Sequence, residues 1–289
     1  MTNFKVVALA VLMGLALPAA AQEDETFVEI MPGDISADPG NLIRGAEMGD
    51  VRALNNLGLL WARGVGVPAA DFKEAMRWWK EAAKRGYSLS MNNLGLLYAN
   101  GHGVKQDYGK ALEWWEMSAE HGDAWAMNSI GDLYENGLGV ERDYGQARDW
   151  YERAARGGDG LAMYNLASMY ENGRGVDPDL QRAITWYQLS ADKGVGVAMS
   201  NLGKMIGAGK GVPADPAEGY AWLTLASSYF SPEDQTEAAE NARDLAALAP
   251  ALDAQQLARA QEIAKNRRVV IEERRKARPV KAGPGESET

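Results

Sequence analysis

The sequence predicts an all-α fold: a right-handed α-α superhelix, or solenoid, of about five helix-turn-helix repeats of 36 residues, followed by C-terminal capping helices. Two observations predict it. Aspartates recur at a fixed spacing along the chain, and each interval between them holds two apolar segments of helical periodicity. No single helix pair can bury its apolar faces alone, so the repeats are expected to fold together.

The repeat length follows from three columns of residues. The aspartates are 36 residues apart at every step, and two glycine-rich columns keep this register apart from one residue inserted in the first loop. A loop accommodates such an insertion at little cost. The columns are Asp71, Asp107, Asp143, Asp179 and Asp215; Gly58, Gly95, Gly131, Ala167 and Gly203; and Gly49, Gly86, Gly122, Gly158 and Gly194.

The third repeat illustrates how each unit is built. Apolar residues recur at helical spacing in both of its segments, and Gly137 supplies the left-handed residue that ends the first helix. Asp143 stands where the second helix needs an N-cap, and Gly158 or Gly157 ends that helix. The apolar positions are Ala126, Ile130, Leu133 and Tyr134 in the first segment, and Ala147, Trp150, Tyr151, Ala154 and Ala155 in the second.

The loop NGLGVERD, beginning at Asn136, has the glycine content of a phosphate-binding loop. A dinucleotide fingerprint needs a preceding strand and a third glycine, and this loop follows a helix and has neither. Its glycines are therefore interpreted as parts of a tight helix-to-helix turn.

The small-residue column predicts close contact between helices, with aromatic side chains filling the remaining gaps. Because the aromatics recur in every unit, they are interpreted as core residues. They are Trp78 and Trp79, Trp114 and Trp115, Trp150 and Tyr151, and Trp186 and Tyr187.

The segment AMNSIGDLYENGLGVERDYGQARDWYERAARGG, from Ala126 to Gly158, resembles the Sel-1-like repeat, a relative of the tetratricopeptide repeat. Five consecutive matches cover about residues 46–225. The last unit departs from the pattern, because Ile206 replaces a tyrosine and Gly207 is expected to interrupt the helix. The resemblance implies an adaptor that holds another molecule on a curved helical surface.

The ends of the chain predict export. Residues 1–21 have the cation, short apolar run and small residues of a cleavable signal peptide, so a periplasmic or secreted location is expected, with no transmembrane segment after cleavage. Residues 22–40 are predicted to be a mobile linker, 41–230 the solenoid, 231–277 capping helices at 232–248 and 253–277, and 278–289 a disordered tail.

Composition excludes several classes of function. A net charge of −10 argues against nucleic acid as a partner, and the chain has no cysteine and only two histidines. No cofactor or metal site is therefore expected. The segment from Lys265 to Lys281 carries a net charge of +6. It is interpreted as a solvated helix end or, alternatively, as a tether to an anionic envelope surface or an acidic protein.

The favoured function is an exported scaffold that binds a protein on the concave face of the repeats. The first helices carry three variable columns, which are Asn55, Asn92, Asn128, Tyr164 and Ser200; Leu59, Leu96, Asp132, Ser168 and Lys204; and Ala62, Ala99, Glu135 and Glu171. We expect these side chains to be exposed, with two leucines side by side. The candidate partner-binding residues are Asn92, Asn128, Asp132, Glu135, Tyr164, Leu59 and Leu96.

Two other functions compete with the protein scaffold. The protein could bind peptidoglycan or an exopolysaccharide, with Tyr164, Asn92 and Asn128 lining an aromatic and amide-rich groove. The third is a hydrolase acting on the cell wall. The chain contains no GxSxG motif and no cysteine nucleophile, so no enzymatic activity is expected.

Overall fold

A computed structural model describes residues 39–231 and 234–276 of the chain. Within these ranges the protein is helical and contains no strand, which confirms the predicted fold class. The predicted signal peptide at 1–21, residues 22–38 of the predicted linker and the tail at 278–289 lie outside the described residues. In the part described, no helix is both long enough and apolar enough to cross a membrane.

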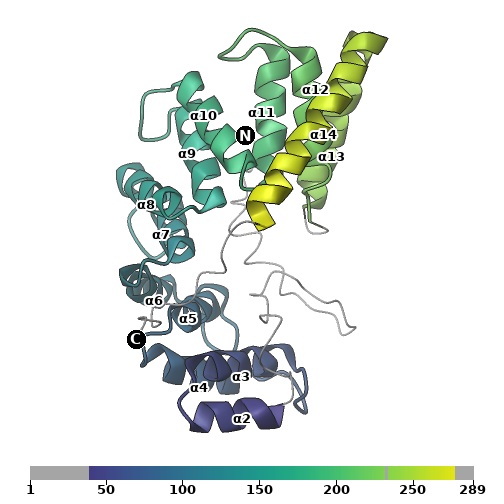
Figure 1. The fold of residues 1–289 in the computed structure, drawn as a ribbon. Helices are drawn as coiled ribbons and strands as arrows, with labels where there is room; N and C mark the ends of the chain where they lie inside the picture. The colour runs from purple at the N-terminus through teal and green to yellow at the C-terminus, as the bar shows by residue number, and fades with distance from the viewer. Residues whose placement is uncertain (1–38, 232–233, 277–289) are drawn as a thin grey trace, which may run out of the picture. The chain divides into compact units, whose positions relative to one another are not determined.

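The described helices are labelled in Figure 1. They are α2 (Pro39–Glu47), α3 (Val51–Arg63), α4 (Phe72–Ala83), α5 (Ser88–Asn100), α6 (Tyr108–Glu120), α7 (Ala124–Asn136), α8 (Tyr144–Arg156), α9 (Gly160–Asn172), α10 (Leu180–Ala191), α11 (Gly196–Ala208), α12 (Pro216–Ala226), α13 (Gln235–Leu248), the 3-10 helix η1 (Ala249–Ala251) and α14 (Ala254–Lys276).

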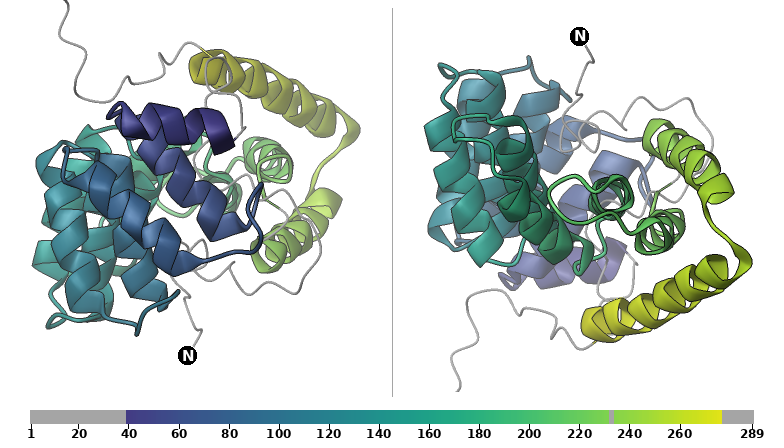
Figure 2. Two further views of the ribbon diagram at one scale, coloured as in Figure 1. Left: turned by 90° about the horizontal axis from the view of Figure 1, so that it is seen from below. Right: turned by 90° about the horizontal axis from the view of Figure 1, so that it is seen from above.

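The described residues fall into two compact units, 39–142 and 143–276. In the first unit each helix from α2 to α7 packs against the next along the chain. The same holds from α8 to α12 in the second unit, where α12 also packs against both α13 and α14. These C-terminal helices are seen from two sides in Figure 2.

The aspartate column caps the second helix of each repeat, as predicted. Asp71 accepts hydrogen bonds from the amides of Lys73 and Glu74 at 2.8 and 3.2 Å. The equivalent side chains of Asp107, Asp143, Asp179 and Asp215 each accept from an amide in the first turn of the following helix. The carboxylate satisfies a helix-end donor that the backbone leaves free, and it complements the helix dipole.

Glycines end the first helices, again as predicted. Gly137, with φ of +68°, is the C-cap of α7. Its equivalents Gly64, Gly101, Gly173 and Gly209 have φ between +68° and +73°. A residue with a Cβ rarely adopts this left-handed conformation, so the turn between the two helices requires glycine.

In the first two repeats, the glycine of the small-residue column and the second aromatic of the pair form the contact between the two helices. A Cβ placed on Gly58 would come 2.3 Å from Nε1 of Trp79, and one on Gly95 would come 2.2 Å from Nε1 of Trp115. Both indoles are buried, as are Tyr151 and Tyr187 in the second unit. The aromatic ring thus occupies the space that a larger residue in the column would need.

Three boundaries differ from the prediction. Helix α2 begins at Pro39, inside the range expected to be linker, and α13 begins at Gln235 rather than at residue 232. Gly207 does not interrupt a helix, since α11 continues through it to Ala208. Packing explains the glycine there, because a Cβ on Gly207 would lie 3.2 Å from Cδ2 of Leu248 and 3.7 Å from Cα of Gly219.

Candidate functional site

The four polar candidates of the first unit are buried, which corrects the expectation of exposure. Asn92 and Asn128 are 6% and 1% exposed, and Asp132 and Glu135 are 3% and 8% exposed. Asn128 and Asp132 do lie on one face of α7, since the amide Nδ2 donates to the carboxylate at 3.5 Å.

The burial has a physical reason that helical periodicity does not report. Each inner helix contacts neighbours on several sides, so most of its circumference is enclosed. Helix α5, for example, packs against both α4 and α6 and also exchanges hydrogen bonds with α3. Polar positions opposite the apolar stripe therefore become interior.

The expectation of two exposed leucines is also wrong. Leu59 is 2% exposed and packs in a cluster with Trp79, Leu94 and Leu97, while Leu96 is half-buried. These side chains are not an exposed apolar patch, because the second helix of the repeat and the next repeat cover Leu59.

Asn55, in the first column, connects two neighbouring repeats. Oδ1 of Asn55 accepts hydrogen bonds from Oγ of Ser90 at 2.9 Å and from Nδ2 of Asn93 at 3.2 Å. The carbonyl of Asn55 accepts from the Trp79 indole at 3.1 Å, and that of Asn92 accepts from the Trp115 indole at 3.4 Å. In the first unit this column is therefore largely structural.

Tyr164, the remaining candidate, belongs to the second unit and is half-buried. Its ring lies against that of Tyr187, with the ring centroids 5.7 Å apart. The Tyr187 hydroxyl donates to Oε2 of Glu171 at 2.8 Å and accepts from Nδ2 of Asn201 at 3.2 Å. Helices α9, α10 and α11 thus share one polar and aromatic cluster.

The charges around this cluster come from several elements. Nζ of Lys210 donates to Oε1 of Glu171 at 2.6 Å, and the guanidinium of Arg174 donates to Oγ of Ser168 at 2.6 Å. Burial raises the pKa of Tyr164, with Glu171 adding to the increase and Arg174 opposing it. Burial and the nearby Glu171 raise the pKa of Tyr187 well above its ordinary value. Both hydroxyls remain protonated near neutral pH.

Sequence reasoning missed Tyr187, Asn201 and Lys210 as members of this cluster. Tyr187 was interpreted only as a core residue, and Lys210 lies in a loop outside the repeat columns. One signal was available, because the fourth repeat places Tyr164 in a column where the other repeats have asparagine or serine.

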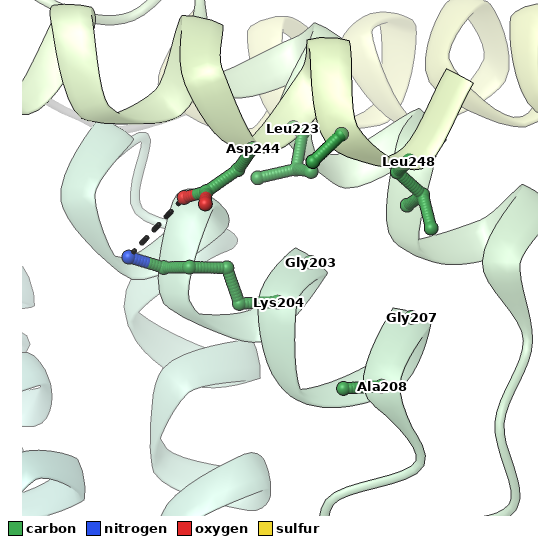
Figure 3. A pocket seen from close by; sticks show the side chains of 8 residues that line it. Gly203, Lys204, Gly207, Ala208, Leu223, Asp244 and Leu248 are labelled. Carbon is green, nitrogen blue, oxygen red and sulfur yellow. Dashed lines mark ion pairs between the residues drawn. The ribbon is translucent and has the colours of Figure 1, made fainter. Parts of the chain in front are cut away.

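A pocket of about 280 Å³ lies next to these columns, between α11, α12 and α13 (Figure 3). Gly203, Gly207, Ala208, Leu223, Ala247 and Leu248 give it an apolar lining. Lys204 and Asp244 stand beside it and form an ion pair of 3.6 Å. The pocket can receive aliphatic groups, with a charge pair to orient them.

Much of the basic C-terminal segment is paired with the second unit. Arg267 reaches Glu218 at 2.6 Å and stacks over the ring of Trp222 at 4.3 Å. Arg274 reaches Asp192 at 2.6 Å. Residues 277–281 of this segment are outside the described range.

The side chains of the candidate site are suited to binding another molecule. Among the residues that the structure describes, no group of three or more histidine, aspartate or glutamate side chains could hold a metal ion. The second unit combines half-buried aromatic rings, ion pairs and an apolar pocket, which together suit non-covalent binding of another molecule.

Repeated caps, a repeated aromatic core and variable inner helices define this molecule as an α-helical repeat protein. The model of the Sel1 repeat matches residues 51–87, 88–123, 126–159, 160–195 and 196–228. The chain therefore belongs to the Sel1 repeat family.

Two solved structures illustrate the likeness. A protective antigen of uropathogenic Escherichia coli that displays an SLR fold is 27% identical, with a TM-score of 0.69 over 86% of this chain and 53% of that one. This chain thus spans about half the length of that protein. A Sel1 repeat protein from Oxalobacter formigenes is 29% identical, with a TM-score of 0.60 over 68% of this chain and 81% of that one. A search of curated proteins gave no match.

Proposed function

We propose that this protein is an exported scaffold that binds another protein through the first helices of its repeats. The observation that carries the proposal is the contrast between two sets of positions. The caps, small residues and buried aromatics recur in each repeat, whereas the variable columns of the second unit carry Tyr164, Glu171 and Lys204. A repeat fold leaves such positions available for recognition.

The chemistry of these positions favours a protein partner. The side chains of Lys204 and Lys210 are 40% and 49% exposed, so each can exchange its present carboxylate for one on a partner. An aliphatic side chain of the partner can enter the apolar pocket beside Lys204 and so exclude water from around such an ion pair. A protein surface offers both carboxylates and aliphatic side chains.

Glycan binding is less well supported. It required the amides of Asn92 and Asn128 to line a groove, and both side chains are buried. Their amides cannot contact a sugar without a rearrangement of the first unit.

The experiment compares charge reversals on the side of the first helices of the repeats with a charge reversal on a second helix. Lys204→Glu and Lys210→Glu alter the first-helix side of the second unit, and Arg182→Glu is the matched control on the second helix α10, where the arginine side chain is 65% exposed. The tagged variants are compared in capture from envelope extract, followed by mass spectrometry, after thermal melts establish equal stability.

The proposal expects one protein that wild type and Arg182→Glu retain and that both lysine variants lose. Retention by both lysine variants, or loss with Arg182→Glu alone, would place binding on another surface and contradict the proposal.

A further inference from the structure

Helix α13 lies over two positions of α11, the first helix of the last repeat. Its Asp244 pairs with Lys204 at 3.6 Å, and its Leu248 approaches Gly207, the residue at the register of Glu171 in the preceding repeat (Figure 3). A helix of the chain itself therefore occupies this part of the first-helix surface of the second unit.

The contacts have a consistent order along the two helices. Asp244 faces Lys204, and four residues later Leu248 faces Gly207, so α13 runs parallel to α11. Near the start of α13, the charge of Glu237 reaches Tyr164 on α9 and contributes to its raised pKa, for which burial is the largest cause. Helix α13 thus contacts positions of two of the columns, at Lys204 and at Gly207.

Helix α13 packs less extensively against the rest of the second unit than α14 does. Only Asn241 of α13 is fully buried, where its Nδ2 donates to the Leu223 carbonyl and to Oγ of Ser227, both at 2.9 Å. Helix α13 also has no side-chain cap at its N-terminus, and the pocket of about 280 Å³ remains between it and α11. Incomplete packing of this kind forfeits dispersion energy.

Helix α14 is anchored much more firmly. It buries Ala260, Ala264 and Ile271 against the second unit. Three of its arginines also form ion pairs. Arg259 contacts Asp215, the N-cap of α12, and Arg267 contacts Glu218 in α12. Arg274 contacts Asp192, the C-cap of α10. The described contacts therefore hold α13 less firmly than α14.

We propose that α13 is an intramolecular competitor for the partner site, and that the partner which displaces it is an amphipathic helix presenting a carboxylate and, one turn later, a leucine. This inference rests on the proposed scaffold function. The carboxylate replaces Asp244 at Lys204, and the leucine replaces Leu248 beside Gly207 and fills the pocket more completely. A helix laid into such a groove typically uses anchors one turn apart.

The test uses the full chain and a labelled synthetic peptide, DQTEAAENARDLAALAPAL, which repeats residues 234–252. Tethered α13 competes at an effective concentration on the order of millimolar, so wild type should bind the peptide weakly. Asn241→Ala removes two hydrogen bonds that hold α13, and fluorescence anisotropy should show binding tighter by about tenfold. Equal affinity for the two proteins would overturn the proposal.

A charge swap identifies where the peptide binds. In the Asn241→Ala background, Lys204→Glu should weaken binding of the peptide, and a peptide carrying lysine at the position of Asp244 should restore it. Without this rescue the peptide binds elsewhere and the proposal fails.

A disulfide bond that links α13 to α11 gives the matched control. The chain has no cysteine, so Gly207→Cys with Leu248→Cys introduces one pair. The oxidised protein should exclude the peptide and the reduced protein should admit it. Binding by both forms would show that α13 does not cover the site.

The outcomes separate this inference from the scaffold function, because the peptide assay needs no natural partner. If the peptide tests fail while the lysine variants still lose the captured protein, α13 is no competitor and the scaffold function stands. If the peptide tests succeed and capture is unaffected, the face binds helices but is not where the scaffold holds its partner.

Discussion

Gly95 lies directly beneath the indole of Trp115. A Cβ on this glycine would come 2.2 Å from Nε1, and the same nitrogen donates to the carbonyl of Asn92 at 3.4 Å. The contact joins the two helices of the second repeat, and Gly58 makes the same contact with Trp79 in the first repeat.

Replacing Gly95 with alanine should therefore destabilise the protein. The buried indole has to move away from its hydrogen-bond acceptor, and such overpacking costs about 1–3 kcal/mol. Gly109→Ala is the control, because a Cβ there meets only a carboxylate oxygen of Asp107, at 3.4 Å. That change should be neutral or stabilising by up to about 1 kcal/mol, since alanine favours the helix. Urea unfolding curves measure both, and equal midpoints would exclude the packing contact.

Asn55→Ala should destabilise the junction between the first two repeats. The change leaves the buried donors of Ser90 and Asn93 without their acceptor, at a cost of about 1–3 kcal/mol. A double-mutant cycle with Ser90→Ala should give a coupling energy above about 0.5 kcal/mol. Strict additivity in the same urea experiment would show that the hydrogen bond is not a coupling between repeats.

The contact between Arg259 and Asp215 should depend on pH. Hydrogen bonding to Arg259, at 3.1 and 2.7 Å, is the largest cause that lowers the pKa of Asp215 below its ordinary value of 3.8. A lowered pKa in the folded state means that the contact stabilises the protein above this ordinary value and is lost as pH falls through the folded-state pKa.

Arg259→Gln tests this dependence. Carbon-13 NMR titration should find the Asp215 pKa raised in the variant, while the cap to the Glu218 amide remains. The stability difference from wild type should be small at neutral pH, because the pair is partly exposed and solvent screens it. It should disappear in strong acid, and a difference that persists there would implicate packing of the arginine stem instead.

Export predicts a defined N-terminus for the mature protein. If residues 1–21 are a signal peptide, the exported chain begins at Gln22. Mass spectrometry of the periplasmic and secreted fractions should find this terminus. A dominant cytosolic form that retains Met1 would contradict export, and it would leave the binding proposals for the second unit untouched.

The repeated elements can be predicted from the amino-acid sequence. The columns of Asp71, Gly58 and Trp79 predicted caps, close approach and core, because each of these features depends on contacts within one helix pair. Such contacts are local, so a fixed spacing in the chain reports them directly.

The chemistry of the candidate site depends on long-range packing that the sequence pattern does not report. Helical periodicity describes the faces of one helix, and it could not report that neighbours would enclose Asp132 and Leu59. Nor could it place α13 over Lys204, because residues 40 positions apart meet only after the chain turns twice. Burial and long-range ion pairs depend on which helices become neighbours, and that arrangement is fixed when the repeats and the C-terminal helices pack together.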